Sequence, residues 1–390
     1  MTRASDVIII GAGVIGCAAA YHLARRGVSV TVLEKDTVGA GGTGRSSAII
    51  RTHYSNELTA RMALHGLRVF QNWGDEVGGE VAFEQTGWVA IMDVRDMTGL
   101  EANIALQRRV GINTSLITAA DLQELMPGID TGDAAAAVYE PESGYADPHL
   151  TVTGYADAAR RHGAKIVVNC EVTGIRFDGD KVAGVDATRG RFDAPAIVNC
   201  AGPWGARVAA LAGVEVPIDA CRVQVAVYRR PPSFTTHPVV MDFLQGAYFR
   251  AETGNITIAG SIDPAEANAV VDPDDFAEHV DAEFEIEMGE KFMRRCPPME
   301  LSESMGGYSS IYAVTPDWHP IIDEVPAGSG SYICSGFSGH GYKLAPAVGL
   351  MVADQVTGES DPRFPTELFR LARYAEDAPV RGQYEYSIAG

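Results

Sequence analysis

A glycine motif near the N-terminus constrains the fold of this chain more than any other feature of its sequence. A short β-branched run, residues 7–10, leads directly into Gly11-x-Gly13-x-x-Gly16. Residues 17–26 (CAAAYHLARR) then have the composition of a helix. A buried strand, a glycine turn and a helix in this order predict the first part of a dinucleotide-binding βαβ unit.

The strand that follows completes the motif. Residues 28–33 (VSVTVL) predict a second buried strand, which ends at Glu34, 18 residues beyond Gly16. Gly11 permits the tight turn, Gly13 lets the backbone approach a pyrophosphate, and Gly16 lets helix and strand pack closely. The helix N-terminus offers N–H groups to the phosphates. Glu34 can accept hydrogen bonds from a ribose diol, and its charge disfavours the 2′-phosphate of NADP.

A second glycine-rich segment distinguishes between the two cofactors that this motif serves. Residues 39–47 (GAGGTGRSS) follow Glu34 within a few positions. NAD-dependent dehydrogenases usually continue there with an ordinary helix and strand. A glycine-rich loop can instead fold back along the same diphosphate and lie against a flavin, so the segment favours FAD over NAD.

Composition is that of a globular protein of one large or two medium domains. The chain has 390 residues, of which 46% are hydrophobic and 21% charged, and its net charge is −20. An acidic surface disfavours nucleic acid and anionic membranes, and an anionic substrate needs local cations. The glycine-spaced N-terminal run is not typical of a signal peptide, and no stretch of about 18 residues is purely apolar. Six cysteines without C-x-x-C spacing indicate a reducing cytoplasm and no metal site.

The order of the remaining patterns predicts an α/β protein, α+β overall, with a doubly wound FAD-binding domain and an inserted, mostly antiparallel substrate domain. Strand-like runs dominate between Cys221 and Ser261, and buried strands running into glycine return after Thr315. We expect the FAD-binding domain to comprise residues 1–80, 145–218 and 315–390, and the substrate domain to comprise residues 81–144 and 219–314. The expected helices include residues 56–76, 96–112, 119–126, 151–162, 206–212 and 274–296, and a turn is expected at 144–148.

Six segments together make the chain resemble the sarcosine oxidase and D-amino acid oxidase superfamily of FAD-dependent amine oxidoreductases. They are DVIIIGAGVIGCAAAYHLARRG, GGTGRSSAIIR, SGYADPHLTVTGYADAARRHGA, NCAGPWGARVAALAG, TPDWHPIID and GFSGHGYKLAPAVG. The resemblance covers essentially the whole chain and is nearest to the sarcosine oxidase β-subunit and dimethylglycine dehydrogenase-like branch. It implies oxidation of the C–N bond of a small or N-methylated amino acid by hydride transfer to flavin N5, giving an imine that hydrolyses.

The resemblance also implies roles for a late glycine-rich loop, residues 336–343 (GFSGHGYK). In this family the loop closes against the pyrimidine end of the flavin, where glycine leaves backbone N–H groups room to approach flavin O2. Lys343 then stabilises the reduced flavin or, together with Arg51, holds a substrate carboxylate. Related enzymes place a tyrosine over the substrate near Tyr248. Arg250, on the same strand face, is a second candidate for the carboxylate.

The predicted catalytic residues are therefore Arg51, Tyr248, Arg250 and Lys343. The predicted cofactor-binding residues are Gly11, Gly13, Val14, Ile15, Gly16, Glu34, Lys35, Gly42, Thr43, Arg45, Ser46, Ser47, Val172, Ala201, Gly202, Gly336, Gly339, His340, Gly341 and Lys343. The expected partners are a small amine or amino acid and either O2 or another electron acceptor, without nucleic acid or membrane insertion, and an oligomer is possible.

The chain departs from the family pattern at two positions. Relatives that attach FAD covalently use a cysteine where Tyr312 stands here, and neither Cys296 nor Cys334 fits that position. Some relatives use a histidine near the N-terminal arginine, for which His53 is a remote candidate, so we expect non-covalent FAD. Monomeric sarcosine oxidase has an oxygen-activating lysine where Thr257 or a neighbour stands here, which keeps a dehydrogenase possible.

Other functions stay open on the sequence alone. One group is a D-amino acid, glycine or proline oxidase or dehydrogenase, and another is an enzyme acting on a larger amine. A third is a flavin-holding subunit of an electron-transfer complex that performs no amine chemistry itself.

Overall fold

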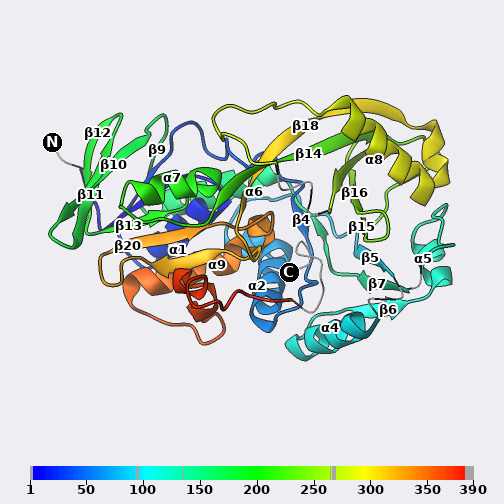
Figure 1. The fold of residues 1–390 in the computed structure, drawn as a ribbon, viewed down its shortest axis with the longest axis horizontal. Helices are drawn as coiled ribbons and strands as arrows, with labels where there is room; N and C mark the ends of the chain where they lie inside the picture. The colour runs from blue at the N-terminus through cyan, green and yellow to red at the C-terminus, as the bar shows by residue number, and fades with distance from the viewer. Residues whose placement is uncertain are drawn as a thin grey trace.

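The computed structural model describes residues 3–93, 95, 97–134, 136–263, 265 and 269–382. The molecule is elongated, with one large sheet in each half of its long axis (Figure 1). The half that contains the N-terminus carries a mostly parallel sheet between layers, and the other half carries a mostly antiparallel sheet.

The first half is built on a six-stranded sheet whose strands come from distant parts of the chain. Its order is β19 (Ile321–Glu324), β20 (Ser331–Ser335), β13 (Ala196–Asn199), β2 (Val7–Ile10), β3 (Val30–Leu33) and β9 (Lys165–Val167). Neighbouring strands are parallel from β20 to β9, and β19 is antiparallel at the edge. Its central strands are buried on both faces, which explains their continuous apolar runs.

Helices cover one face of this sheet and a second sheet covers the other. Helix α1 (Val14–Arg25) contacts both α6 (Pro148–Arg161) and α9 (Gly341–Thr357). The opposite face packs on α7 (Gly205–Ala210) and on a four-stranded sheet. That sheet has the order β1 (Arg3–Ala4), β12 (Gly190–Asp193), β11 (Lys181–Ala187) and β10 (Val172–Asp178). The three layers confirm the predicted doubly wound α/β fold class.

The second half is built on an eight-stranded sheet. Its order is β18 (Glu303–Val314), β14 (Asp219–Arg229), β17 (Ile256–Ser261), β16 (Ala247–Glu252), β15 (Val239–Asp242), β5 (Trp88–Met92), β7 (Ala136–Glu140) and β6 (Ser115–Ile117). All neighbours are antiparallel except β15 and β5. The strands of the six-stranded sheet all fall in the three pieces predicted for the FAD-binding domain, and these eight fall in the other two.

The two faces of the eight-stranded sheet have different neighbours. One face packs on α8 (Ala282–Arg295) and α5 (Ala119–Leu125), in a core that includes Phe249 and Ala259. The other face packs on α4 (Met97–Val110) and carries Tyr248. Because side chains alternate along a strand, Arg250 shares the face of Tyr248, which is the face turned to the first half.

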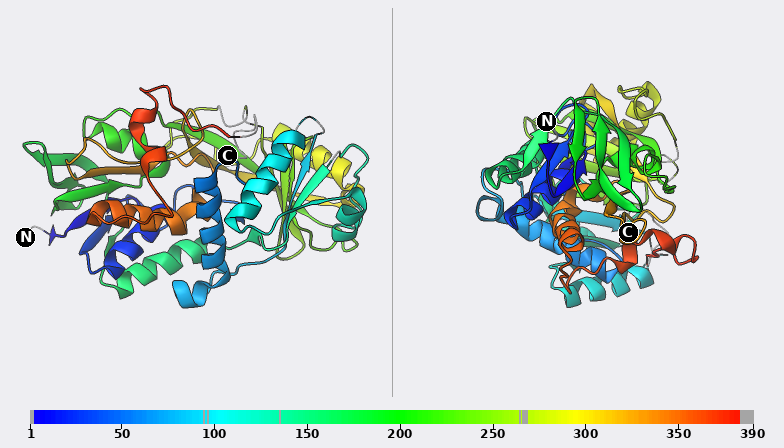
Figure 2. Two further views of the ribbon diagram at one scale, coloured as in Figure 1. Left: turned by 90° about the horizontal axis from the view of Figure 1, so that it is seen from below. Right: turned by 90° about the vertical axis from the view of Figure 1, so that its left-hand side faces the viewer.

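Two further elements join the halves. Helix α2 (Glu57–Gln71), followed by the short α3 (Trp73–Glu76), contacts α9 on one side and α4 on the other (Figure 2). The second is the two-stranded ladder of β4 (Ile49–Ile50) and β8 (Gly144–Tyr145), in which β4 contacts both α2 and α9. None of the described helices is long and apolar enough to cross a membrane.

Three predicted elements were wrong in their bounds. The segment 274–296 is helical only from Ala282. Residues 272–281 lie outside the helix, begin with a turn in which the Asp275 N–H donates to the Asp272 carbonyl at 3.0 Å, and contact the first half. The predicted turn at 144–148 contains strand β8 and the start of α6, which Asp147 caps by accepting a hydrogen bond from the Leu150 N–H. The predicted helix 56–76 divides at Asn72 into α2 and α3.

Candidate cofactor and substrate site

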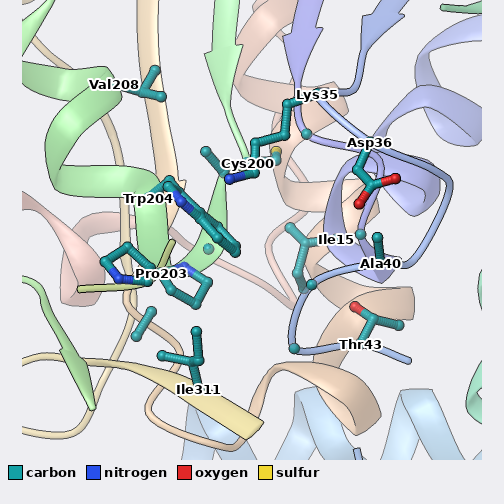
Figure 3. Close-up of a pocket in the computed structure, with 18 of the residues that line it drawn as sticks. Ile15, Lys35, Asp36, Ala40, Thr43, Cys200, Pro203, Trp204, Val208 and Ile311 are labelled. Carbon is teal, nitrogen blue, oxygen red and sulfur yellow. The ribbon is translucent and has the colours of Figure 1, made fainter. Parts of the chain in front are cut away.

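A cavity of about 780 Å³ runs between the two halves. Its wall combines the N-terminal glycine motif, the loop after Glu34, the residues after β13, strand β18 and the late glycine loop. Figure 3 shows Ile15, Ala40 and Thr43 on one side of the cavity, facing Trp204 and Ile311 on the other. Segments from both ends of the chain therefore enclose one elongated space.

Glycine is required where the first strand turns into α1. Gly11 has a φ of +104°, and a Cβ there would lie 2.6 Å from the carbonyl oxygen of Cys200. A Cβ on Gly16 would overlap the carbonyl oxygen of Gly11, so Gly16 contributes helix packing and does not line the cavity. Gly13 lines the cavity at the N-terminus of α1. The turn at Gly11 and the close packing at Gly16 are those that the motif predicts, and the approach of a pyrophosphate to Gly13 stays a prediction.

Glu34 is fixed against this turn by two backbone N–H groups. One carboxylate oxygen accepts from Ala12 at 2.7 Å, and the other accepts from Asp36 at 2.9 Å. The Thr43 hydroxyl accepts a hydrogen bond of 3.1 Å from the Val14 N–H, in the first turn of α1. The loop after Glu34 therefore folds back onto the helix N-terminus, as a loop lying along a diphosphate would.

A strap from the second half closes the cavity near Glu34. We define the strap as residues 272–278, five of which line the cavity, namely Pro273, Asp274, Asp275, Phe276 and Glu278. Asp274 accepts hydrogen bonds from Lys35, from the Trp204 indole at 2.9 Å and from Arg207 at 2.8 Å. Sequence reasoning missed the strap, because a short acidic run gives no signal of the basic partners that it will meet.

The late glycine loop meets strand β18 at the far end of the cavity. Gly339 has a φ of +85°, and a Cβ there would lie 2.6 Å from the ring of Tyr312. A Cβ on Gly42 would lie 2.9 Å from the carbonyl oxygen of Ile311. The backbones of the two loops and of β18 therefore approach one another closely, and only glycine leaves room for that approach.

Most of the predicted cofactor-binding residues line this cavity. They are Gly11, Gly13, Val14, Ile15, Glu34, Lys35, Gly42, Thr43, Arg45, Ser46, Val172, Ala201, Gly202, Gly339 and Gly341. The wall does not include Gly16, Ser47, Gly336, His340 or Lys343. Gly336 has a φ of +78° and packs closely on Thr315. His340 and Lys343 lie buried behind the wall.

The structure brings Arg51 and Lys343, from opposite ends of the sequence, within electrostatic range of each other. Both side chains are buried, with relative exposures of 3% and 6%. Burial, and secondly the charge of Arg51, hold the pKa of Lys343 well below its usual range. The Arg51 guanidinium lies 4.4 Å from the ring centroid of Tyr54 and donates a hydrogen bond to the His53 carbonyl oxygen. Two buried cations within electrostatic range of each other are suited to an anionic ligand.

Tyr248 lies on the sheet face turned to the first half. It lines a small cavity of about 30 Å³ that shares Arg45, Ser46, Ser310 and Tyr312 with the wall of the large one. Ser47 lines the same small cavity. The Tyr248 ring packs on the backbone of Gly260 in the neighbouring strand, which no larger residue would allow. Burial, chiefly, raises the pKa of Tyr248 well above its usual range.

Arg250 is buried beside Tyr248 but has a carboxylate partner of its own. Its guanidinium forms an ion pair of 2.8 Å with Glu252 and lies 4.3 Å from the ring centroid of Tyr145. Strand β8, which carries Tyr145, pairs with β4 just before Arg51. Arg250 is therefore held between the two halves, with part of its charge already balanced.

Comparison with known proteins agrees with this arrangement. A family model described as "FAD dependent oxidoreductase" matches residues 6–355. The chain belongs to the FAD dependent oxidoreductase family. It is accordingly an FAD-dependent enzyme, and the recognised superfamily and branch are confirmed. The cavity wall fits this cofactor, because Glu34 and the N-terminal turn lie at one end and glycine backbone lies at the other.

Two relatives and one solved structure show how widely the resemblance extends. The mitochondrial sarcosine dehydrogenase of Homo sapiens is 29% identical over 363 residues, covering 90% of this chain but only 39% of that protein. The sarcosine oxidase subunit beta of Rhodobacter capsulatus is 24% identical, covering 97% of this chain and 91% of that one. The crystal structure of L-proline dehydrogenase from P. horikoshii has a TM-score of 0.89, 29% identity, and coverage of 98% of this chain and 100% of that one.

Proposed function

We propose that this enzyme oxidises the C–N bond of a small or N-methylated amino acid, such as sarcosine or proline, to an imine that hydrolyses. The observation that carries this proposal is the buried pair Arg51 and Lys343, which interact electrostatically. Neither lines the cavity, but Lys343 directly follows Gly341 and Tyr342, which do. Bound FAD supplies the hydride acceptor at N5. The names of the relatives, which refer to sarcosine and to L-proline, support a carboxylated amine as substrate.

The chain's own residues contribute mainly positioning. Arg51 and Lys343 hold the substrate carboxylate, and two cations from different elements fix both its place and its orientation. Tyr248 covers the substrate from the sheet face, where burial keeps its hydroxyl protonated. No catalytic base is needed once the amine is neutral, so rate depends on how well the α-carbon is placed. Arg250 supports this site from the side, since Glu252 already pairs with it.

The FAD is held without a covalent bond in this proposal. Two of the described cysteines line the cavity, Cys170 and Cys200, and both accompany residues of the nucleotide-binding motif. Tyr312 lies on the wall where some relatives have a cysteine. His53 is buried, stacks on Trp88 at 5.2 Å between centroids and does not line the cavity. Acid precipitation should therefore release all of the flavin into the supernatant.

The surroundings of Thr257 favour a dehydrogenase, which passes its electrons to an acceptor other than O2. The Thr257 hydroxyl lies 3.0 Å from both Arg230 and His237, on the sheet face that packs under α8. The residues on either side of Thr257 in β17, Ile256 and Ile258, are uncharged and point to the opposite face, where Arg250 is already paired with Glu252. The sheet therefore lacks a cation at Thr257, and the cations Arg51 and Lys343 are occupied by the substrate carboxylate in this proposal. Since a cation near the flavin stabilises superoxide as it forms, slow reaction with O2 is expected.

An anaerobic titration tests the proposal. Sarcosine, glycine, L-proline and D-proline are added in turn to the FAD-loaded protein, and the flavin absorbance is followed. We expect at least one amino acid to bleach the flavin, and slow recovery when air is admitted. Flavin that stays oxidised with every amino acid would instead favour a flavin-holding subunit, a role consistent with the resemblance to a sarcosine oxidase subunit.

A further inference from the structure

The segment after β4 is unusually rich in buried polar side chains. Residues 51–55 (RTHYS) are all buried, although none of them is apolar except for the ring of Tyr54. Neighbouring groups hold its backbone, since the Thr52 N–H donates to Glu140 at 2.9 Å and Gln107 donates to the Tyr54 carbonyl at 3.3 Å. The proposed function uses only Arg51 from this segment.

Tyr54 contacts both parts of the chain that supply the proposed cation pair. Its ring lies against the Arg51 guanidinium, 4.4 Å from ring centroid to the central carbon. Its hydroxyl lies 3.1 Å from Nδ1 of His340, at hydrogen-bond distance. His340 immediately precedes α9, the helix that carries Lys343 in its first turn. One side chain thus links the N-terminal cation to the loop that presents the C-terminal one.

The link is neutral, although it lies between two cations. Burial, and then the charges of Lys343 and Arg51, hold the pKa of His340 well below its usual range, so its imidazole is uncharged. Burial raises the pKa of Tyr54 to about 12, so its phenol keeps its proton. A neutral pair adds no repulsion to the cations, and the face of a tyrosine ring attracts a guanidinium.

We propose that Tyr54 is a positioning residue that, through its ring and its bond to His340, holds Arg51 and Lys343 at the separation that one carboxylate spans. Two buried cations repel each other, although the buried Glu140 carboxyl interacts electrostatically with Arg51. A site that must first bring the two cations together loses affinity for the ligand. The inference rests on the proposed function, because it assumes that the cation pair receives a carboxylate.

The test compares two matched ligands that cannot be oxidised at an sp³ α-carbon. Pyrrole-2-carboxylate is a planar analogue of proline, and pyrrole-2-carboxamide has the same shape without the charge. Both are titrated into the FAD-loaded enzyme, and binding is followed by the change in the flavin spectrum. The wild type is expected to bind the carboxylate at least about tenfold more tightly than the amide, as expected for a charged group paired with buried cations.

Two variants separate the roles of the ring and the hydroxyl. Tyr54→Leu removes the stacking surface and is expected to weaken carboxylate binding about tenfold, while amide binding changes less than about twofold. Tyr54→Phe keeps the ring and loses the bond to His340, with an expected loss of about threefold. Tyr332→Phe, on strand β20 of the six-stranded sheet, is the matched control and should leave both affinities unchanged.

Each outcome decides one point. A carboxylate-to-amide ratio that stays at the wild-type value in both Tyr54 variants overturns the positioning role while leaving the proposed function intact. If the wild type itself does not discriminate between the two ligands, the cation pair does not bind carboxylate and the proposed function fails first. Should Tyr54→Leu lose FAD, the isosteric Tyr54→Phe decides, and an unchanged ratio there overturns the tether to His340.

Discussion

The two ends of the cofactor cavity use charge in opposite ways. At the nucleotide end, the ion pairs of the strap are half exposed, with Lys35 at 34% and Asp274 at 50% of side-chain exposure. At the end proposed to hold the flavin ring, Arg51 and Lys343 are buried, with the neutral side chains of Tyr54 and His340 beside them and the buried Glu140 carboxyl near Arg51.

We infer from this difference that the exposed ion pairs help to hold the cofactor, whereas the buried cations act on the substrate. Exposed ion pairs are weakened by water and salt, so the strap contributes modestly and reversibly. Buried charges act at full strength, because no solvent competes with the ligand for them. Changes at the flavin end should therefore alter substrate turnover strongly, whereas changes at the nucleotide end should alter only FAD retention, and weakly.

The largest effect is expected from Lys343→Met. Removing one of two buried cations that bind a carboxylate weakens binding of the transition state by several kcal/mol. The value of kcat/KM for a carboxylated amine should therefore fall about 100-fold or more. FAD content, measured by absorbance, should stay near the wild-type value. The control is Lys35→Met, which removes a lysine at the exposed end and should change kcat/KM less than about twofold. Equal losses in both variants would erase the contrast between the two ends.

The next effect concerns the backbone at the flavin end. Gly339→Ala adds a Cβ that would meet the Tyr312 ring at 2.6 Å, at a φ of +85°. Strain of about 1–3 kcal/mol should weaken FAD binding roughly tenfold or more, as measured by fluorescence titration of apoprotein. Gly358→Ala is matched in conformation, with a φ of +72°, but no other atom lies within 4 Å of its Cβ. It should lower thermal stability slightly and leave FAD affinity unchanged.

The pH dependence of carboxylate binding should follow Lys343. Its pKa is held well below the usual range, so the free site loses a proton at lower pH than an exposed lysine would. A bound carboxylate favours the protonated form, and binding therefore takes up a proton once the pH exceeds the pKa of Lys343 in the free site. Affinity for pyrrole-2-carboxylate should then fall with rising pH, by up to about tenfold per unit. Constant affinity between pH 6 and pH 10, in spectral titrations, would contradict this.

The smallest effect is expected at the strap. Asp274→Asn weakens the ion pairs with Lys35 and Arg207, so FAD should dissociate about twofold to fivefold faster at low salt. The difference from wild type should disappear in about 0.5 M salt, because exposed pairs are screened. Asp361→Asn, in a surface ion pair with Arg363, is the control. Release rates of FAD are read from the return of flavin fluorescence.

Local patterns were sufficient to predict most of the fold and the nucleotide end. The strand, glycine turn and helix around Gly11 are contiguous in sequence, and the structure shows a backbone reason for Gly11 and for Gly16. Glu34 and Thr43 follow within the same stretch and reach the same turn. Elements formed by residues that are close in sequence can be predicted from one sequence, because the secondary-structure propensity of the residues agrees with how they pack.

Contacts between distant segments were harder to predict from the sequence. The pairing of Arg51 with Lys343 came from the family resemblance, and the link between Tyr54 and His340 had no local signal, because the two residues are 286 positions apart. The strap was misread as the start of α8, since Asp274 and its neighbours resemble the acidic first turn of a helix. Its basic partners lie in the other half of the molecule.

A crystal structure of the enzyme with FAD and pyrrole-2-carboxylate tests the central claim most directly. We predict that the flavin ring lies beside Gly339 and that the ligand carboxylate lies within hydrogen-bond distance of both Arg51 and Lys343. A carboxylate bound elsewhere, or a flavin far from Gly339, would contradict it.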